Sequence, residues 1–446
     1  MREASPRPVL SLWDAVAMIV GVVVGAGIFK TPALVAANAG SDLLVLATWL
    51  AGGLVSLAGA LCYAELVSAH PHPGGEYHFL TRAYGRETGF LFAWTRLAVM
   101  QTGSIALLAF VVGDYLQQLL PLGARGAGLY AGAAVAAFTL LNVLGIRGSS
   151  GTQNLLTLMT VLGVAALAAV GLVFGTGPAP GAAAPPAPSA PGLGLAMVFV
   201  LLTFGGWNEA AYVSAEVRGG SRNLVRALLI SIAVITTLYL LLNLALLRGL
   251  GREALARTEA PADALMHGLF GPTGAALVSS LVVVVALASL NVTIFTGART
   301  CFAMARDFRL FRALGYWKDD SNAPVMALLV QGGIALLLVV LGALTRDGFE
   351  TMVEYVSPVF WLFFLLTGLS LFVLRRREPH APRPFLVPGY PFTPIVFCLA
   401  CAYLLYSSLN YTGVGALVGV AVLAAGLPLL LLARRVQIDF GSDPQP

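Results

Sequence analysis

The stretch Gly21-Val22-Val23-Val24-Gly25-Ala26-Gly27-Ile28-Phe29 lies in the middle of the first long apolar segment. A membrane helix is expected to run unbroken here, yet glycine weakens a helix interior by about 1 kcal/mol relative to alanine. An unwound turn inside a bilayer is tolerated only where it is buried in protein or lines a cavity. A second interrupted segment, Phe204-Gly205-Gly206-Trp207-Asn208, occurs in a later apolar run. Paired interruptions of this kind are the best sequence indication of a binding site in a transporter.

The composition indicates a membrane protein. Of 446 residues, 58% are hydrophobic and 11% are charged, and the mean hydropathy is +0.85. Soluble domains carry roughly 25% charged residues. Apolar runs long enough to cross a bilayer, about 18 residues or more, recur along the chain. The net charge of +5 does not indicate a nucleic-acid partner, because the basic residues lie in short loops.

Twelve membrane helices are expected. They cover residues 12–37, 42–68, 87–119, 127–146, 152–175, 193–216, 224–247, 272–306, 323–344, 353–375, 391–410 and 413–433. A proline-rich linker from Thr176 to Pro191 separates the fifth helix from the sixth, because proline disfavours a helix interior. The chain, residues 1–446, is thus expected to form a single domain.

The spacing of the two breaks predicts an internal repeat. The second break falls in the sixth helix, five helices after the first, which fits two five-helix repeats of inverted topology. The first repeat would cover about 12–175 and the second about 193–375, with two further helices over about 391–433.

The charge pattern predicts the orientation. If the N-terminus is cytoplasmic, most arginines fall on the cytoplasmic side of twelve spans, as the positive-inside rule requires. The arginines left on the outer side are Arg125, Arg248, Arg252, Arg257 and Arg346. We therefore expect a multi-pass protein of the plasma (cell inner) membrane with both termini in the cytoplasm.

The two breaks can together bind a zwitterion. Unwinding frees backbone N–H groups in the first helix, which suit a carboxylate, and carbonyl groups in both helices, which suit an ammonium. The aromatic residues Phe204 and Trp207 are candidates to cover or gate the pocket, and the alternative is that they are ordinary core residues. The candidate substrate-binding residues are Val23, Val24, Gly25, Ala26, Gly27, Ile28, Leu202, Thr203, Phe204, Gly205 and Trp207. The alternative for the glycines is close helix packing.

Several motifs resemble one family. The run Gly25-Ala26-Gly27-Ile28-Phe29-Lys30-Thr31-Pro32 resembles the first-helix signature of the amino acid–polyamine–organocation superfamily. The run Thr203-Phe204-Gly205-Gly206-Trp207-Asn208, followed by Glu216 and Arg222-Asn223-Leu224-Val225-Arg226-Ala227, is similar to the sixth helix and its exit in the L-type amino acid transporter branch. The resemblance implies a LeuT-type fold, with helices 1 and 6 unwound at mid-membrane, and alternating-access transport of amino acids.

The chain departs from that family in its fifth helix. Sodium-independent members of the branch carry a lysine there, and Thr160 occupies the corresponding position. Either a sodium ion bound near Gly21, Val24 and Ser289 replaces the lysine charge, or transport is uncoupled or proton-linked. The expected coupling-ion region comprises Gly21, Val24, Thr160, Ser289 and Glu209. No other cofactor is expected.

The functional expectation is a secondary transporter, not an enzyme. Neutral L-amino acids are favoured as substrates, by exchange or by ion coupling, because the two breaks carry no charged side chain. The alternatives are a cationic amino acid or amine antiporter and a membrane amino acid sensor that does not transport. The expected partners are the amino acid and the lipid bilayer, with no nucleic acid and no obligatory protein partner.

Overall fold

The computed structural model describes residues 8–175, 190–258, 260–344, 348–412 and 414–439. Over these residues the chain is helical, and its only β-type pairings are the isolated bridges Leu10–Val217 and Lys318–Ala323. The elements are α1 (Leu12–Val23), η1 (Ala26–Phe29), α2 (Thr31–Asn38), α3 (Asp42–Ala69), α4 (Glu76–Tyr84), α5 (Arg86–Thr95), η2 (Arg96–Met100), α6 (Gln101–Leu119), α7 (Gly126–Leu144), α8 (Ile146–Phe174), α9 (Ala190–Thr203), η3 (Trp207–Val213), α10 (Gly220–Leu250), α11 (Arg252–Arg257), α12 (Pro261–Asp307), η4 (Arg309–Gly315), α13 (Val325–Leu344), α14 (Gly348–Arg377), α15 (Phe392–Thr412) and α16 (Val414–Asp439).

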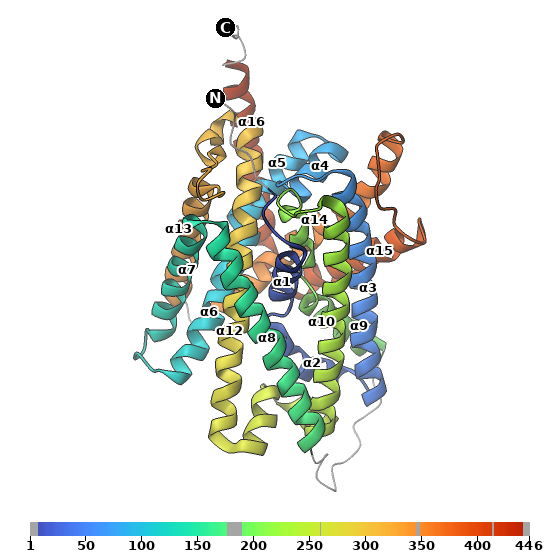
Figure 1. The fold of residues 1–446 in the computed structure, drawn as a ribbon, viewed down its shortest axis with the longest axis vertical. Helices are drawn as coiled ribbons and strands as arrows, with labels where there is room; N and C mark the ends of the chain where they lie inside the picture. The colour runs from blue at the N-terminus through green and yellow to red at the C-terminus, as the bar shows by residue number, and fades with distance from the viewer. Residues whose placement is uncertain (1–7, 176–189, 259, 345–347, 413, 440–446) are drawn as a thin grey trace.

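Most of these helices are membrane helices by length and composition. Within the described residues, ten helical segments are long and apolar enough to cross a bilayer, and two shorter apolar helices cover Leu12–Val23 and Val420–Ala433. Figure 1 shows the long helices running side by side along the long axis of the molecule. The chain is therefore an all-helical, multi-pass membrane protein.

Short α1 lies in the middle of this bundle (Figure 1), where it contacts α8, α10, α12 and η3. Ser11 caps α1, because its hydroxyl accepts a hydrogen bond from the Asp14 N–H, and the Asp14 carboxylate in turn accepts one from the Ser11 N–H. The preceding residue, Leu10, pairs with the chain beyond η3. Its N–H donates to the Glu216 carbonyl at 2.9 Å, and its carbonyl accepts from the Arg218 N–H at 2.7 Å.

The helix boundaries differ from expectation at several places; the expected fifth helix, 152–175, for example, begins at Ile146. The expected third helix, 87–119, contains the π-helical turn η2 between α5 and α6. The eighth is extended by the segment from Pro261 to Phe270, which joins it through a kink at Gly271 (φ 62°, ψ −150°). The last two residues of the expected linker, Ala190 and Pro191, already belong to α9, since proline is tolerated in a first helical turn. The rest of that linker, 176–189, lies outside the described residues.

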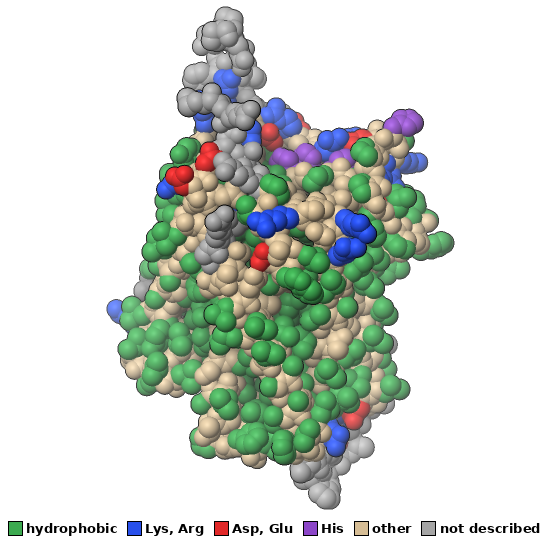
Figure 2. All heavy atoms as spheres, viewed as in Figure 1, with side chains coloured by type: hydrophobic (Ala, Val, Ile, Leu, Met, Phe, Trp, Pro, Cys, Tyr) green, Lys and Arg blue, Asp and Glu red, His purple; other side chains and the backbone are tan. Residues whose placement is uncertain are grey.

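The surface divides into an apolar belt and a charged end. In Figure 2, green side chains cover the middle of the visible face, whereas arginines, acidic residues and the purple histidines gather near the end that holds α4 and α5. Exposed leucines on α7, α8 and α13, such as Leu140, Leu158 and Leu337, belong to the apolar surface. A lipid environment explains their exposure, because lipid tails are as apolar as leucine.

Candidate functional site

The first helix is broken where its glycines predict. α1 ends at Val23, and Val24 (φ −75°, ψ 74°) adopts an inverse γ-turn in which the Gly25 N–H donates to the Val23 carbonyl at 2.8 Å. The 3-10 turn η1 then begins at Ala26. Among the described residues the N–H groups of Ala26 and Gly27 have no hydrogen-bond partner, whereas the N–H of Gly25 is already used by the turn. The free donors are thus those of Ala26 and Gly27.

The second break follows α9. The Gly205 N–H donates to the Leu202 carbonyl at 3.1 Å, and Gly206 is left-handed (φ 113°) before η3 begins. Only glycine adopts this conformation readily, and a Cβ there would lie 3.3 Å from the Val22 side chain. In the part of the chain that the structure describes, the carbonyls of Val24 and Gly205 accept no hydrogen bond.

The two breaks lie against each other. Thr203 Oγ1 donates to the Phe199 carbonyl, so the 2.7 Å contact between Thr31 and Thr203 has Thr31 as its donor. A Cβ on Gly27 would lie 3.4 Å from Thr203 Oγ1. We call residues 21–29 and 202–208 the helix-break site. It brings together the backbone of both interrupted segments that the sequence singles out.

A tyrosine that the sequence analysis did not single out bridges the breaks. The Tyr239 hydroxyl on α10 lies 2.8 Å from the Val23 carbonyl and 3.1 Å from the Thr203 carbonyl. One hydroxyl has one proton, so it donates to the two carbonyls in turn or shares its proton between them. No periodicity or motif marks Tyr239, because its role depends on the packing of α10 against α1.

The two candidate aromatic residues face different surroundings. Phe204 is buried and packs against Trp49 and Tyr239, with ring centroids 6.2 and 4.9 Å away. Trp207 packs edge-on against Tyr63 at 5.0 Å. Phe204 therefore lies in the core between α3 and α10.

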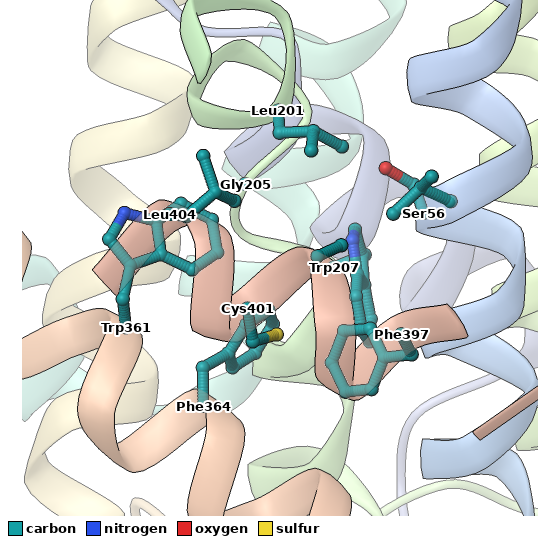
Figure 3. A pocket seen from close by; sticks show the side chains of 11 residues that line it. Ser56, Leu201, Gly205, Trp207, Trp361, Phe364, Phe397, Cys401 and Leu404 are labelled. Atoms are coloured by element: carbon teal, nitrogen blue, oxygen red, sulfur yellow. The ribbon is translucent and has the colours of Figure 1, made fainter. Parts of the chain in front are cut away.

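Trp207 lines a small apolar pocket (Figure 3). Its indole lies between Ser56 of α3 and Phe397 of α15, and the pocket reaches Gly205 at the second break. Trp361 and Leu404 complete other parts of its wall. The pocket therefore joins the helix-break site to aromatic side chains of α14 and α15.

The expected coupling-ion region is partly assembled. The Ser289 hydroxyl on α12 donates to the Gly21 carbonyl at 2.8 Å. Gly21 also allows close approach from α8, because a Cβ there would lie 2.1 Å from Gln153 Nε2. Thr160 is buried on the same helix, and its hydroxyl has no partner among the described residues. The polar groups of this region are thus hydroxyls, a backbone carbonyl and an amide, and all of them are neutral.

A polar chain extends from this region. Gln153 Nε2 donates to Thr157 Oγ1 at 2.9 Å, and Thr157 donates to the Ala17 carbonyl. Asn291 Nδ2 donates to Gln153 Oε1 at 3.0 Å, and Asn142 Nδ2 donates to Asn291 Oδ1 at 2.9 Å. Helices α1, α7, α8 and α12 are thereby linked without any charge.

Glu209, the fifth candidate of that region, belongs to a different cluster. Its two carboxylate oxygens lie 2.9 and 2.7 Å from Arg96 Nη2. Arg96 Nη1 lies 3.9 Å from a Glu76 oxygen. We call Glu76, Arg96 and Glu209 the buried charge cluster. The sequence carried a signal for it, since an arginine inside an apolar span requires a buried partner.

A second buried ion pair joins α12 to the segment between η3 and α10. Arg299 and Glu216 form a two-point salt bridge through Nε and Nη2, and both side chains are almost fully buried. The Arg299 guanidinium also lies 3.3 Å from the centroid of the Phe295 ring. The positive charge of Arg299 and the negative charge of Glu216 therefore compensate each other.

Next to Asn208, the helix-break site meets the charge cluster. The Asn208 side chain is 1% exposed, and neither its oxygen nor its nitrogen has a partner among the described residues. A buried amide without partners is costly in a folded protein. Asn208 is thus a further candidate to contact a bound molecule.

Histidines occupy the loop at the charged end. The rings of His72 and His78 stack at 4.3 Å, and the His70 ring lies 6.4 Å from His78. Burial lowers the pKa of His78 to about 3, and the neighbouring His72 adds to this shift. Burial also lowers the pKa of His70 and of His72. Among the described residues, no group of three or more His, Cys, Asp or Glu side chains could hold a metal ion.

Comparisons with known proteins identify relatives of the whole chain. A family model described as amino acid permease matches residues 10–427. The b(0,+)-type amino acid transporter 1 of Mus musculus is 30% identical over 423 residues, which cover 91% of this chain and 83% of that protein. The Asc-type amino acid transporter 1 of Homo sapiens is 30% identical over 436 residues, covering 95% and 82%. The large neutral amino acids transporter small subunit 2 of Mus musculus is 31% identical over 434 residues, covering 95% and 80%.

Proposed function

Because this chain belongs to the amino acid permease family, we propose that it carries neutral L-amino acids across the plasma membrane by alternating access. That it is an amino acid transporter and not an enzyme follows from the family and from relatives of nearly its full length. The substrate class and the mechanism are the parts we propose. The adjacent pair of broken helices, with unpaired backbone donors and acceptors, is the observation that carries them.

The helix-break site has the groups that an α-amino acid needs. The free N–H groups of Ala26 and Gly27 suit a carboxylate, because a helical N-terminus is positive and its first donors are unpaired. The free carbonyls of Val24 and Gly205 suit an ammonium. Backbone groups recognise what all amino acids share, so substrate choice depends on the surrounding side chains.

Neutral substrates are favoured by the lack of charge at this site. Residues 21–29 and 202–208 include no Asp, Glu, Lys or Arg. The adjacent acid, Glu209, is already paired with Arg96. A cationic side chain would therefore meet no unpaired carboxylate, which argues against the cationic amino acid or amine alternative.

For ion coupling, the oxygens near Gly21 partly fit a sodium ion. The Ser289 hydroxyl and the Gly21 and Val24 carbonyls would hold it, and Thr160 adds a buried hydroxyl without a partner. Oxygen ligands of this kind bind sodium in transporters with broken helices. Bound sodium would supply the positive charge that Thr160 lacks. Proton coupling and uncoupled exchange are the alternatives.

The fold and the membrane orientation extend the proposal. Counting Leu12–Val23 and Val420–Ala433 as spans brings the total to twelve, which would accommodate the 5+5 inverted repeat and an even number of crossings. The arginine distribution supports cytoplasmic termini. A protein partner deserves a test, because one relative's name describes it as a small subunit.

Counterflow in proteoliposomes tests the function. Vesicles containing the purified protein would be loaded in turn with alanine, leucine, serine or arginine, with and without sodium or a pH gradient. We expect the neutral amino acids to exchange and arginine not to exchange. No exchange of any amino acid would contradict the proposal, and exchange of arginine alone would favour the cationic alternative. Activity of the single purified chain would show that no partner is required.

A further inference from the structure

The buried charge cluster is centred on an irregular turn. Arg96 begins the π-helical turn η2, and its side chain is 2% exposed. Single π-helical turns occur frequently at functional sites. The guanidinium lies over the Tyr212 ring, 4.0 Å from its centroid. The cluster thus joins η2 to η3, the element that follows the second helix break.

The cluster contains more acid than base. Glu209 takes both of its close contacts from one nitrogen of Arg96, whereas Glu76 lies at 3.9 Å from another. Arg96 Nε has no partner among the described residues. If both carboxylates were ionised, the cluster would have a net charge of −1 inside the protein. Burying an uncompensated charge is far more costly than burying a neutral acid.

Glu76 is the acid that can hold a proton. It is the first residue of α4 and is 2% exposed. Tyr63 of α3 donates to one of its oxygens, and Tyr212 of η3 donates to the other. Burial raises the pKa of the Glu76 carboxyl, whereas Arg96 and the two tyrosine hydroxyls oppose that shift.

The other groups around the cluster do not compensate the charge of Glu76. Glu209 adds a negative charge and raises the pKa of Glu76 further. On α12, the buried Cys301 lies close enough to Arg96 to interact with its charge. On α14, the Thr367 hydroxyl lies near Tyr63. Neither group carries a charge that could pair with Glu76.

The cluster lies across a junction that alternating access must open. Its members come from α4, η2 and η3, and η3 continues into the segment that pairs with Leu10. Separating η3 from α4 would bring water to Glu76, and hydration favours its ionised form. A group whose proton affinity differs between two states biases the equilibrium between them.

We propose that Glu76 is a proton-binding site that locks the cytoplasmic end of the transporter closed when it is protonated. The inference rests on the proposed function for the meaning of closed and open, and it adds regulation by cytoplasmic pH. When η3 and α4 separate, the carboxyl proton passes to cytoplasmic water. A low cytoplasmic pH therefore slows transport, and a high cytoplasmic pH allows it to proceed faster.

The first test compares pH profiles. Counterflow of leucine would be measured with the pH varied from 5.5 to 8 on the cytoplasmic face, for the wild type and for Glu76→Gln. We expect the wild-type rate to rise with pH, and the Glu76→Gln rate to stay flat at the low rate that the wild type shows at pH 5.5. Glu378→Gln is the matched control, because Glu378 forms an outer pair with Arg82 and should keep the wild-type profile. A Glu76→Gln profile identical to that of the wild type overturns the inference.

A second readout does not depend on transport. Cys301 is buried and close enough to Arg96 to interact with its charge, so we expect it to become accessible when the cluster opens. Its alkylation from the cytoplasmic side, followed by peptide mass spectrometry, should at pH 8 be several-fold slower in Glu76→Gln than in the wild type. Equal labelling at pH 8 overturns the inference, even if no amino acid is exchanged. Failed counterflow with pH-dependent labelling would instead contradict the proposed function alone.

A milder variant covers the case in which Glu76→Gln does not fold. Tyr212→Phe removes one hydrogen bond to the ionised carboxylate, which raises the pH midpoint of the profile. A hydrogen bond to a charged group corresponds to a shift of about one pH unit. An unchanged midpoint in folded Tyr212→Phe overturns the inference as well.

Discussion

The helix-break site and the buried charge cluster meet at two consecutive residues, Asn208 and Glu209. They nevertheless treat buried polar groups in opposite ways. The break site leaves neutral backbone groups of Ala26, Gly27, Val24 and Gly205 unpaired. The cluster pairs every charge it can around Arg96. Free neutral dipoles are cheap enough to remain ready for a ligand, whereas free charges are not. We therefore expect the unpaired groups to contact a bound molecule, whereas the paired charges hold α4, η2 and η3 together.

The largest expected effect is on stability, and it comes from breaking the buried ion pair between Arg299 and Glu216. Arg299→Met leaves Glu216 buried without its partner, and removing one member of a buried pair costs about 3–5 kcal/mol. The unfolding temperature in detergent should fall clearly. Adding Glu216→Leu should restore part of the loss, because the uncompensated charge is then removed. Arg82→Met, which breaks a partly exposed pair with Glu378, should cost less than about 1 kcal/mol.

The next largest effect is on substrate affinity at the helix-break site. The stability of the protein should hardly change there. Gly27→Val adds methyl groups beyond the Cβ position, which already lies 3.4 Å from Thr203 Oγ1. It should displace the free N–H groups and weaken substrate binding by about 100-fold, if two hydrogen bonds to a carboxylate are lost at about 1.5 kcal/mol each. Binding would be measured by scintillation proximity. Gly333→Val, at a position with open space around the Cβ, should bind normally. Normal substrate binding by Gly27→Val would show that the substrate carboxylate does not bind at this turn.

A smaller effect is expected at the bridge between the breaks. Tyr239→Phe keeps the ring but removes the hydroxyl that reaches the Val23 and Thr203 carbonyls. One neutral hydrogen bond contributes about 0.5–1.5 kcal/mol, so affinity should fall by about tenfold at most. Tyr130→Phe removes a hydroxyl bonded to the Leu120 carbonyl far from the breaks, and its affinity should equal that of the wild type. Equal affinities in both variants would show that the breaks hold their geometry without the bridge.

The smallest effect tests the charged end by pH. Burial lowers the pKa of His78 to about 3, so the folded protein holds this ring neutral. The unfolded ring titrates near 6.5, so this contribution to stability is complete above about pH 6.5 and is lost progressively as the pH falls towards 3. Thermal unfolding between pH 7.5 and 5 should show a shallower decline in His78→Gln than in the wild type. Parallel declines would assign the acid sensitivity to other groups.

The sequence predicts the fold well where single helices decide it. The expected helix 42–68 matches α3 (Asp42–Ala69), because its apolar run is long and ends in a loop with His72 and Pro73. The breaks at Gly25 and Gly206 are also predicted, since glycine leaves a local mark. The membrane class and the amino acid permease family are confirmed by the comparisons. The inverted repeat and the substrate-binding roles stay predictions.

Interactions between distant helices are what the sequence does not reveal. The sequence places Glu209 in a coupling-ion region, but its carboxylate pairs with Arg96, which lies 113 residues earlier in the chain. Tyr239 and Gln153 reach the first helix through packing that no local pattern records. Arg96 and Arg299 carry a usable signal, since an intramembrane arginine must have a partner.

The pairing of Leu10 with the chain after η3 has a mechanical consequence. Its two backbone hydrogen bonds tie the start of α1 to the end of the sixth-helix segment. These two ends can separate only after both bonds break, and together they contribute about 1–3 kcal/mol. An energy of this size shifts a two-state population by about 5- to 150-fold. We therefore expect the backbone of Leu10 to set how often the two ends are held together.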